Sequence, residues 1–128
     1  MNGSLLDTNI IVGFLNGDKP ISQRLSGVQD FYAPAVAMGE LYYGAKKSAR
    51  VQQNLEKIEL FASRCTILAC DKNTALCYGE IKEALRRQGT PIPENDIWIA
   101  AVAVQHDLIL ATRDAHFEKI SGLIFELW

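Results

Sequence analysis

Short apolar runs alternate along the chain with longer segments whose apolar residues recur at helical spacing. The short runs show no alternation of apolar and polar residues, which is typical of strands buried on both faces of a sheet. They occupy residues 5–6, 30–33, 66–68, 108–111 and 123–127. The regular alternation of strands and helices predicts an α/β fold with a parallel central sheet.

The helical segments differ in how much of their surface is apolar. Residues 51–64 carry apolar side chains on one face, whereas residues 93–106 are apolar nearly all round after the first turn, which predicts a buried helix. The longest helix is expected to begin near Asp71 and to end at Gly89. The expected helices are residues 9–15, 35–47, 51–64, 71–89, 93–106 and 113–120.

Length and composition favour one ordinary globular domain. The chain has 128 residues, of which 48% are hydrophobic and 22% charged, and it contains no internal repeat or linker. We therefore expect a single domain over residues 1–128. The formal net charge of -2 provides no overall attraction to nucleic acid or to an anionic membrane, although a local basic patch can act against the average.

The cysteines, the histidines and the length of the apolar runs further limit the class of protein. The three cysteines are odd in number and form no CxxC pair, so neither a disulfide framework nor a zinc framework is expected. His106 and His116 stand in no ligand spacing that would indicate a structural zinc site. The N-terminus lacks a signal-peptide pattern, and the longest apolar run, residues 97–104, is far shorter than the roughly 18 residues of a membrane span. We expect a cytoplasmic protein with no membrane contact.

Four carboxylates occupy positions that suit a binding site. Asp7 follows the first strand and Asp114 follows the fourth, at the strand ends where ligands bind in open parallel sheets. Glu40 lies in an otherwise apolar helix, with no basic residue three or four positions away. Asp96 begins the buried helix on a face of small side chains, so it could face a cavity. Buried carboxylates are costly unless they are paired or bound to a cation.

Each of these acids also has an ordinary structural explanation. Asp7 and Asp114 could cap helices, Asp96 could be an acid favoured by the helix dipole, and Glu40 could have a tertiary partner. If the four converge instead, two carboxylates about 4 Å apart repel by about 4 kcal/mol at an effective dielectric of about 20. Such a cluster binds protons or a divalent cation, and oxygen ligands favour Mg²⁺ or Mn²⁺, which bridge to phosphates.

Further polar residues could support such a site. Three residues lie within two positions of an acid and could orient it, although ordinary turn or cap roles are equally open: Asn9, Asn95 and Thr112. Six basic residues are candidate contacts for RNA phosphates: Lys46, Lys47, Arg50, Arg86, Arg87 and Arg113. The alternative for the first five is a solvated helix surface.

Four motifs together resemble a known family. They are "LLDTNI", "GELYYGA" around Glu40, "PIPENDIWIAA" around Asp96 and "LATRDAHF" around Asp114. Each motif alone is weak, but their order and separation along essentially the whole chain resemble those of PIN-domain ribonucleases. The chain is particularly similar to the VapC-type toxins of bacterial toxin–antitoxin pairs.

This resemblance implies a PIN-like α/β/α sandwich with a short-stranded, mostly parallel central sheet. It implies that Asp7, Glu40, Asp96 and Asp114 bind Mg²⁺ or Mn²⁺ and that the protein is an endoribonuclease acting on tRNA or rRNA. Asp7, Asp96 and Asp114 would be the principal ligands, and Glu40 would bind directly, bind through water or accept a proton. The implied partners are a cognate antitoxin protein and a second copy of the chain, in a homodimer.

Two other functions fit acids at the ends of parallel strands. One is a Mg²⁺-dependent receiver-like phosphoacceptor domain, which is disfavoured because no adjacent acidic pair follows the first strand and no lysine directly follows residues 108–111. The other is a catalytically inert acidic binding module.

Overall fold

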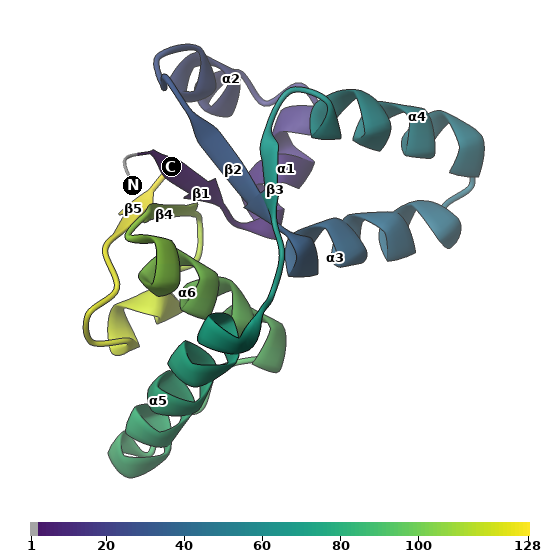
Figure 1. The fold of residues 1–128 in the computed structure, drawn as a ribbon. Coiled ribbons are helices and arrows are strands. Elements are labelled where there is room, and N and C mark those ends of the chain that lie inside the picture. Colours follow the sequence, from purple (N-terminus) through teal and green to yellow (C-terminus); the bar gives the residue numbers. More distant parts are fainter. Residues whose placement is uncertain (1–2) are drawn as a thin grey trace.

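A central β-sheet organises the chain (Figure 1). The computed structural model describes residues 3–128. In chain order the elements are β1 (Ser4–Leu6), α1 (Thr8–Leu15), α2 (Lys19–Ser26), β2 (Phe31–Pro34), α3 (Ala35–Lys46), α4 (Val51–Ala62), β3 (Thr66–Leu68), α5 (Lys72–Gln88), α6 (Glu94–His106), β4 (Ile109–Thr112), the 3-10 helix η1 (Ala115–Lys119) and β5 (Phe125–Leu127).

The strands pair in the order β3-β2-β1-β4-β5, and every pair is parallel. Leu5, in the middle of the sheet, lies opposite Tyr32 of β2 and Leu110 of β4. The chain first runs outward from β1 to β3 and then returns to the other side of β1 as β4. The strand order therefore reverses between β1 and β4, which is the position where open α/β sheets leave a crevice at the carboxyl ends of their strands.

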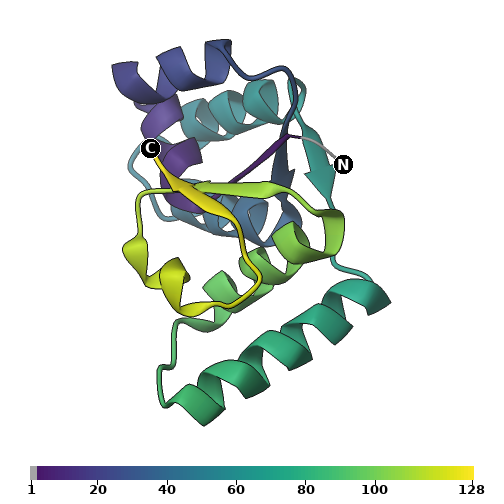
Figure 2. The same ribbon diagram turned by 90° about the vertical axis from the view of Figure 1, so that its left-hand side faces the viewer.

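Helices cover both faces of the sheet, so the predicted α/β/α sandwich is confirmed (Figure 2). Successive strand residues point to opposite faces. Leu5 and Leu110 accordingly pack with α5 and α6 in one core, whereas Leu6 and Ala111 pack with helices α1 to α4 in the other. The two cores hold the central strands in place on both sides.

Helix α6 is buried, as its apolar sequence predicts. Ile97 is 3% exposed, and the side chains from Ile99 to Ala103 are fully buried. The helix begins at Glu94 directly after Pro93, which places Asp96 in its first turn. Because the core holds this helix through these buried side chains, the position of Asp96 is fixed as well.

The structure contains one helix that the apolar pattern did not predict. In α2, only Ile21 and Leu25 are buried, which gives a weak apolar signal over eight residues. The capping signals are clearer: Asp18 accepts a hydrogen bond from the backbone N–H of Ile21, and Pro20 lies in the first turn.

The helix expected over residues 113–120 is shorter and tighter than predicted. It is the five-residue 3-10 helix η1, which begins after Asp114. No helix within residues 3–128 is both long enough and apolar enough to cross a lipid bilayer.

Candidate metal centre

Asp7 joins the end of β1 to the start of α1. Its backbone N–H donates to the carbonyl oxygen of Ala111 at 2.9 Å, next to the pairing of β1 with β4. Its Oδ1 accepts a hydrogen bond from the backbone N–H of Thr8 at 2.8 Å, so Asp7 is the N-cap of α1. Only 4% of the residue is exposed. The carboxylate is therefore fixed at the point where the strand order reverses.

Thr112, the last residue of β4, connects Asp7 to Asp114. Its hydroxyl donates to Oδ2 of Asp7 at 2.7 Å and accepts from the backbone N–H of Asp114 at 3.0 Å. Thr112 is fully buried. Of the three residues expected to orient the acids, Thr112 is the one that the structure places in direct contact with an acidic side chain within residues 3–128.

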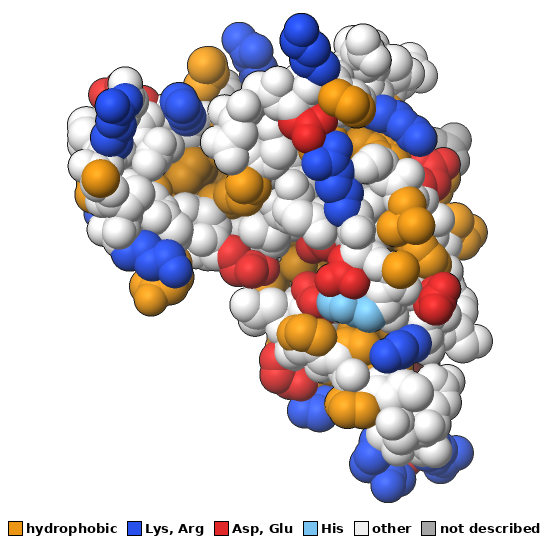
Figure 3. Space-filling view, turned by 180° about the vertical axis from the view of Figure 1, so that it is seen from behind, with side chains coloured by type: hydrophobic (Ala, Val, Ile, Leu, Met, Phe, Trp, Pro, Cys, Tyr) orange, Lys and Arg blue, Asp and Glu red, His pale blue; other side chains and the backbone are white. Residues whose placement is uncertain are grey.

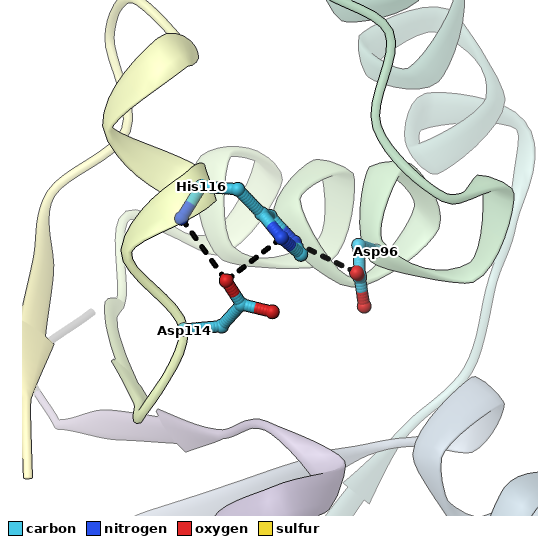
Figure 4. A group of neighbouring side chains, drawn as sticks. All are labelled: Asp96, Asp114 and His116. Carbon is cyan, nitrogen blue, oxygen red and sulfur yellow. Dashed lines mark hydrogen bonds and ion pairs between the residues drawn. The ribbon is translucent and has the colours of Figure 1, made fainter.

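Asp96 and Asp114 lie on either side of His116 (Figure 4). Nε2 of the imidazole is 2.8 Å from Oδ2 of Asp96, and Nδ1 is 2.7 Å from Oδ1 of Asp114. The backbone N–H of His116 also donates to Oδ1 of Asp114 at 3.1 Å, so Asp114 caps η1. The three side chains each offer a ligand atom, and these atoms lie within 4.8 Å of one another.

His116 is a residue of this group that the sequence did not indicate, since neither histidine stands in a recognisable ligand spacing. The relevant signal is its position two residues after Asp114 in "TRDAHF". The tight turn at the start of η1 brings the imidazole back against that carboxylate. This turn was not evident from the spacing of histidines and acids alone.

Neighbouring charges change the pKa of Asp7 and of Asp96. Burial raises the pKa of Asp7, and the charge of Asp114 raises it further, while hydrogen bonds from Thr112 and Thr8 oppose this shift. Burial also raises the pKa of Asp96, as do the nearby charges of Asp7 and Asp114, while His116 opposes this shift. Asp7, Asp96, Asp114 and His116 therefore lie in one site, which we call the acidic site.

Lysine and arginine do not neutralise the predicted carboxylates. Within residues 3–128, no such side chain forms an ion pair with any of the four acids. Arg113, although adjacent to Asp114, pairs with Asp18 at 2.8 Å and donates to the carbonyl oxygen of Trp128 at 2.9 Å. In Figure 3, acidic side chains gather on one side of a histidine.

Glu40 connects to the acidic site through Thr8. The Thr8 hydroxyl donates to Oε1 of Glu40 at 2.9 Å, and Thr8 directly follows Asp7. Thr8 and Glu40 also line a cleft of about 240 Å³ between α1, α3 and α4. Glu40 is thus linked to the residue that follows Asp7, and it forms no ion pair with a lysine or arginine among the described residues.

Within the described part of the chain, neither Asn9 nor Asn95 forms a side-chain hydrogen bond with an acidic side chain. Oδ1 of Asn9 accepts from the backbone N–H of Arg113 at 3.3 Å, so it supports the loop that leads to Asp114. Asn95 is exposed in the first turn of α6.

The candidate RNA contacts lie on three separate parts of the surface. Lys46 and Lys47 end α3 and Arg50 precedes α4, and all three are exposed. Arg86 and Arg87 on α5 both contact Glu83, at 2.7 and 3.0 Å. Arg113 is the sixth. Its guanidinium is held by Asp18.

The donor set fits a divalent cation. Carboxylate oxygens suit Mg²⁺ and Mn²⁺, and the imidazole adds a nitrogen donor. Nε2 of His116 is buried and has no hydrogen-bond partner among the described residues. A cation bound between this nitrogen and the carboxylates of Asp96 and Asp114 would satisfy the nitrogen and balance the negative charge.

Comparisons with known proteins agree with this geometry. Residues 4–123 match the family model described as PIN domain. The chain is 38% identical to "Ribonuclease VapC2" from Haemophilus influenzae and 38% identical to "tRNA(fMet)-specific endonuclease VapC" from Shigella flexneri. Each alignment covers 97% of this chain and 96% of the relative.

Solved structures give the same result. The DNA-bound VapBC from Salmonella typhimurium matches with a TM-score of 0.94 and 32% identity, and VapBC2 from Rickettsia felis bound to a DNA fragment from the promoter matches with 0.92 and 30%. Each match covers all of this chain and 99% of the other. Because the family model matches most of the chain and these relatives match it along nearly its whole length, the chain belongs to the PIN-domain family and, within it, to the VapC ribonucleases.

Proposed function

We propose that this chain is a metal-dependent endoribonuclease that hydrolyses RNA phosphodiester bonds and acts as the toxin of a toxin–antitoxin pair. Membership of the VapC ribonucleases supports the reaction class. The observation that carries the proposal for this chain is the convergence of Asp7, Asp96 and Asp114, without lysine or arginine partners among the described residues. Such a site suits Mg²⁺ or Mn²⁺.

The residues of this chain would have distinct roles. Asp7, Asp96 and Asp114 would hold the ion, and Thr112 would fix the orientation of Asp7 through its hydrogen bond. A bound divalent ion polarises a phosphate and makes a water molecule more nucleophilic. Glu40 is bound by Thr8 only through Oε1, so Oε2 can accept the proton of the attacking water.

The exposed basic residues at the end of the α3–α4 hairpin would hold the RNA backbone. We favour Lys46, Lys47 and Arg50 over the pair on α5, because Arg86 and Arg87 share the carboxylate of Glu83. Arg113 would help to position the loop that carries Asp114, since its guanidinium is held by Asp18. These contacts would attract phosphates without selecting a base sequence.

Transfer RNA is the first substrate to test, with ribosomal RNA as the second. One relative carries the name tRNA(fMet)-specific endonuclease, and several structural neighbours are VapBC toxin–antitoxin complexes. We therefore propose a cognate antitoxin as the protein partner. We also propose that the toxin acts in the cytoplasm as a homodimer.

RNA cleavage with mapping of the new RNA ends tests the proposal. The wild-type protein should cleave tRNA in Mg²⁺ or Mn²⁺, lose activity in EDTA and regain it with excess Mn²⁺. Asp7→Asn and Asp96→Asn should each lower the rate by at least about a hundredfold, since each removes a charged ligand of the ion. Glu83→Gln, an acid outside the site, serves as the control and should retain the wild-type rate.

Two outcomes would contradict the nuclease. One is wild-type cleavage by both aspartate variants. The other is a folded wild-type protein that binds Mn²⁺ but cleaves neither tRNA nor rRNA, which would favour the inert acidic binding module.

A further inference from the structure

We propose that His116 is a nitrogen ligand of the metal ion held by Asp96 and Asp114, and that it raises the affinity of the site for Co²⁺ and Mn²⁺ relative to Mg²⁺. This inference rests on the metal-dependent nuclease proposed above. It adds a fifth residue to the four carboxylates of the proposed site. It also predicts which divalent ions this chain binds most tightly.

The position of the imidazole is the first observation that supports this role. Its two ring nitrogens lie 2.8 and 2.7 Å from carboxylate oxygens of Asp96 and Asp114, which come from different elements of the fold (Figure 4). The ring is held beside Asp114 by the η1 turn, and the side chain of His116 is only 22% exposed. The imidazole is therefore already located among the proposed ligand oxygens.

The second observation concerns the direction of the contact with Asp96. Nε2 of His116 is buried and has no hydrogen-bond partner among the described residues, although Oδ2 of Asp96 is only 2.8 Å away. The carboxylate oxygen thus lies off the direction in which the ring nitrogen could donate. A nitrogen lone pair and a carboxylate oxygen that approach each other in this way can both point to a shared cation.

The chemistry of the imidazole sets the expected preference. Mg²⁺ binds oxygen ligands almost exclusively, whereas imidazole is a good ligand for first-row transition metals. Adding one nitrogen to an otherwise oxygen-based site should therefore strengthen Co²⁺ and Mn²⁺ binding much more than Mg²⁺ binding. Nδ1 contacts Asp114, and a carboxylate partner on the second ring nitrogen is typical of metal-binding histidines.

A different role for His116 predicts the opposite result. If the imidazole were a cation that merely neutralises Asp96 and Asp114, it would compete with a metal ion for the same carboxylates. Its removal would then increase the affinity of the site for every divalent ion. The sign of the change in metal affinity therefore distinguishes a ligand from a counter-ion.

The experiment measures metal binding without RNA. EDTA-treated wild-type, His116→Gln and His106→Gln proteins are titrated with Co²⁺, Mn²⁺ and Mg²⁺ at one pH by calorimetry, and folding is checked by circular dichroism. We expect His116→Gln to weaken Co²⁺ and Mn²⁺ binding by about tenfold or more and Mg²⁺ binding by less than about threefold. His106→Gln removes the other histidine of the chain, at the end of α6, and should bind like the wild type.

A spectroscopic readout tests the coordination itself. Electron spin echo modulation from a ¹⁴N nucleus bound to Mn²⁺ should be present in the wild type and in His106→Gln and absent in His116→Gln. The inference would be wrong if His116→Gln bound Mn²⁺ as tightly as the wild type or more tightly, and if its ¹⁴N signal did not differ from that of the wild type. This result would leave the proposed nuclease intact. A wild-type protein that binds none of the three ions would overturn both proposals.

Discussion

Single residues in the acidic site combine structural and functional roles. Asp7 caps α1 through Oδ1, yet its Oδ2 accepts from Thr112 and its charge acts on Asp96. Asp114 similarly caps η1 and contacts His116. Capping fixes each carboxylate at the end of a strand, and this is the position in which it can also bind a cation. The two explanations considered for these acids are therefore compatible.

Asp7→Asn should stabilise the metal-free protein at neutral pH. Burial raises the pKa of Asp7, so the folded chain binds this proton more tightly than the unfolded chain does. Ionisation of Asp7 therefore costs folding free energy above its raised pKa, and Asn avoids this cost. We expect a gain on the order of 1 kcal/mol at pH 7, measured by urea unfolding in EDTA.

The dependence on pH supplies the control for this prediction. Below about pH 3 the carboxyl group is mostly protonated in both states, so the stability advantage of the variant should be smallest there. As pH rises through the raised pKa of Asp7, the wild type should lose stability relative to the variant. A difference that stays constant from pH 3 to pH 7 would contradict the role of burial.

Thr112→Val should disrupt the acidic site without changing the shape of the side chain greatly. The substitution leaves Oδ2 of Asp7 and the backbone N–H of Asp114 without their shared partner. We expect a loss of about 1–3 kcal/mol in unfolding free energy and about tenfold weaker Mn²⁺ binding. Thr112→Ser retains the hydroxyl and is the matched control. Equal Mn²⁺ affinities for the Val variant and the wild type would show that this hydroxyl does not orient the site.

The sequence identified the acids more readily than their neighbours. Asp7 and Asp114 follow apolar strands, and Glu40 and Asp96 lie in apolar helices, so their positions alone were informative. His116 was missed because its contact with Asp114 depends on a five-residue 3-10 turn, and turns of this length leave no periodic pattern. Thr112 was one of three candidates to orient an acid, and its hydrogen bond to Asp7 follows from the pairing of the distant strands β1 and β4.

At the scale of elements, the end of α6 offers a test of how firmly this helix holds Asp96. Asp107 ends the helix with φ 54°, in the left-handed region that favours glycine. Asp107→Gly should therefore raise the unfolding free energy by about 0.5–1 kcal/mol, as measured by urea unfolding. Metal affinity should not change, because the substitution is at the opposite end of the helix from Asp96.

Asp107→Ala is the contrasting variant. Alanine lacks the short polar side chain that helps aspartate adopt this conformation, so it should destabilise the protein. Should both variants have the same stability as the wild type, backbone strain at this position would not contribute to the stability of α6.

The predictability of an element followed its apolar content. Helix α6 was predicted because most of its residues are apolar, and the short helix α2 was missed because two buried residues in eight give little periodicity. The apolar strands gave the α/β class but not their order in the sheet. That order depends on crossovers whose geometry is not encoded in any local pattern.

The whole molecule explains why acids from distant parts of the sequence meet. β1 and β4 are far apart in the chain but adjacent in the sheet, and the strand order reverses between them. Asp7 and Asp114 follow these two strands. Helix α6 packs against the face of the sheet that carries Leu5 and Leu110, and it brings Asp96 to the same end. A fold stabilised by its two apolar cores thus retains a site of unbalanced negative charge.

This unbalanced charge predicts that a divalent ion stabilises the entire protein. Mn²⁺ at about 100 times its dissociation constant should raise the unfolding free energy by about 2.7 kcal/mol, and hence the Tm by roughly 10 °C, relative to EDTA. Asp96→Asn should lose most of this increase, whereas Glu83→Gln on α5 should retain it. NaCl at matched ionic strength should have a much smaller effect, because screening reduces repulsion only partly in a buried site.

The comparison between these variants separates specific binding from general screening. Glu83 lies on the surface of α5 with two arginine partners, so its removal changes the net charge by the same amount as Asp96→Asn but leaves the acidic site intact. If Mn²⁺ stabilised Asp96→Asn and Glu83→Gln equally, the ion would be acting on the overall charge of the protein. Stabilisation that disappears only with Asp96 would instead link the ion to the carboxylates at the carboxyl ends of β1 and β4.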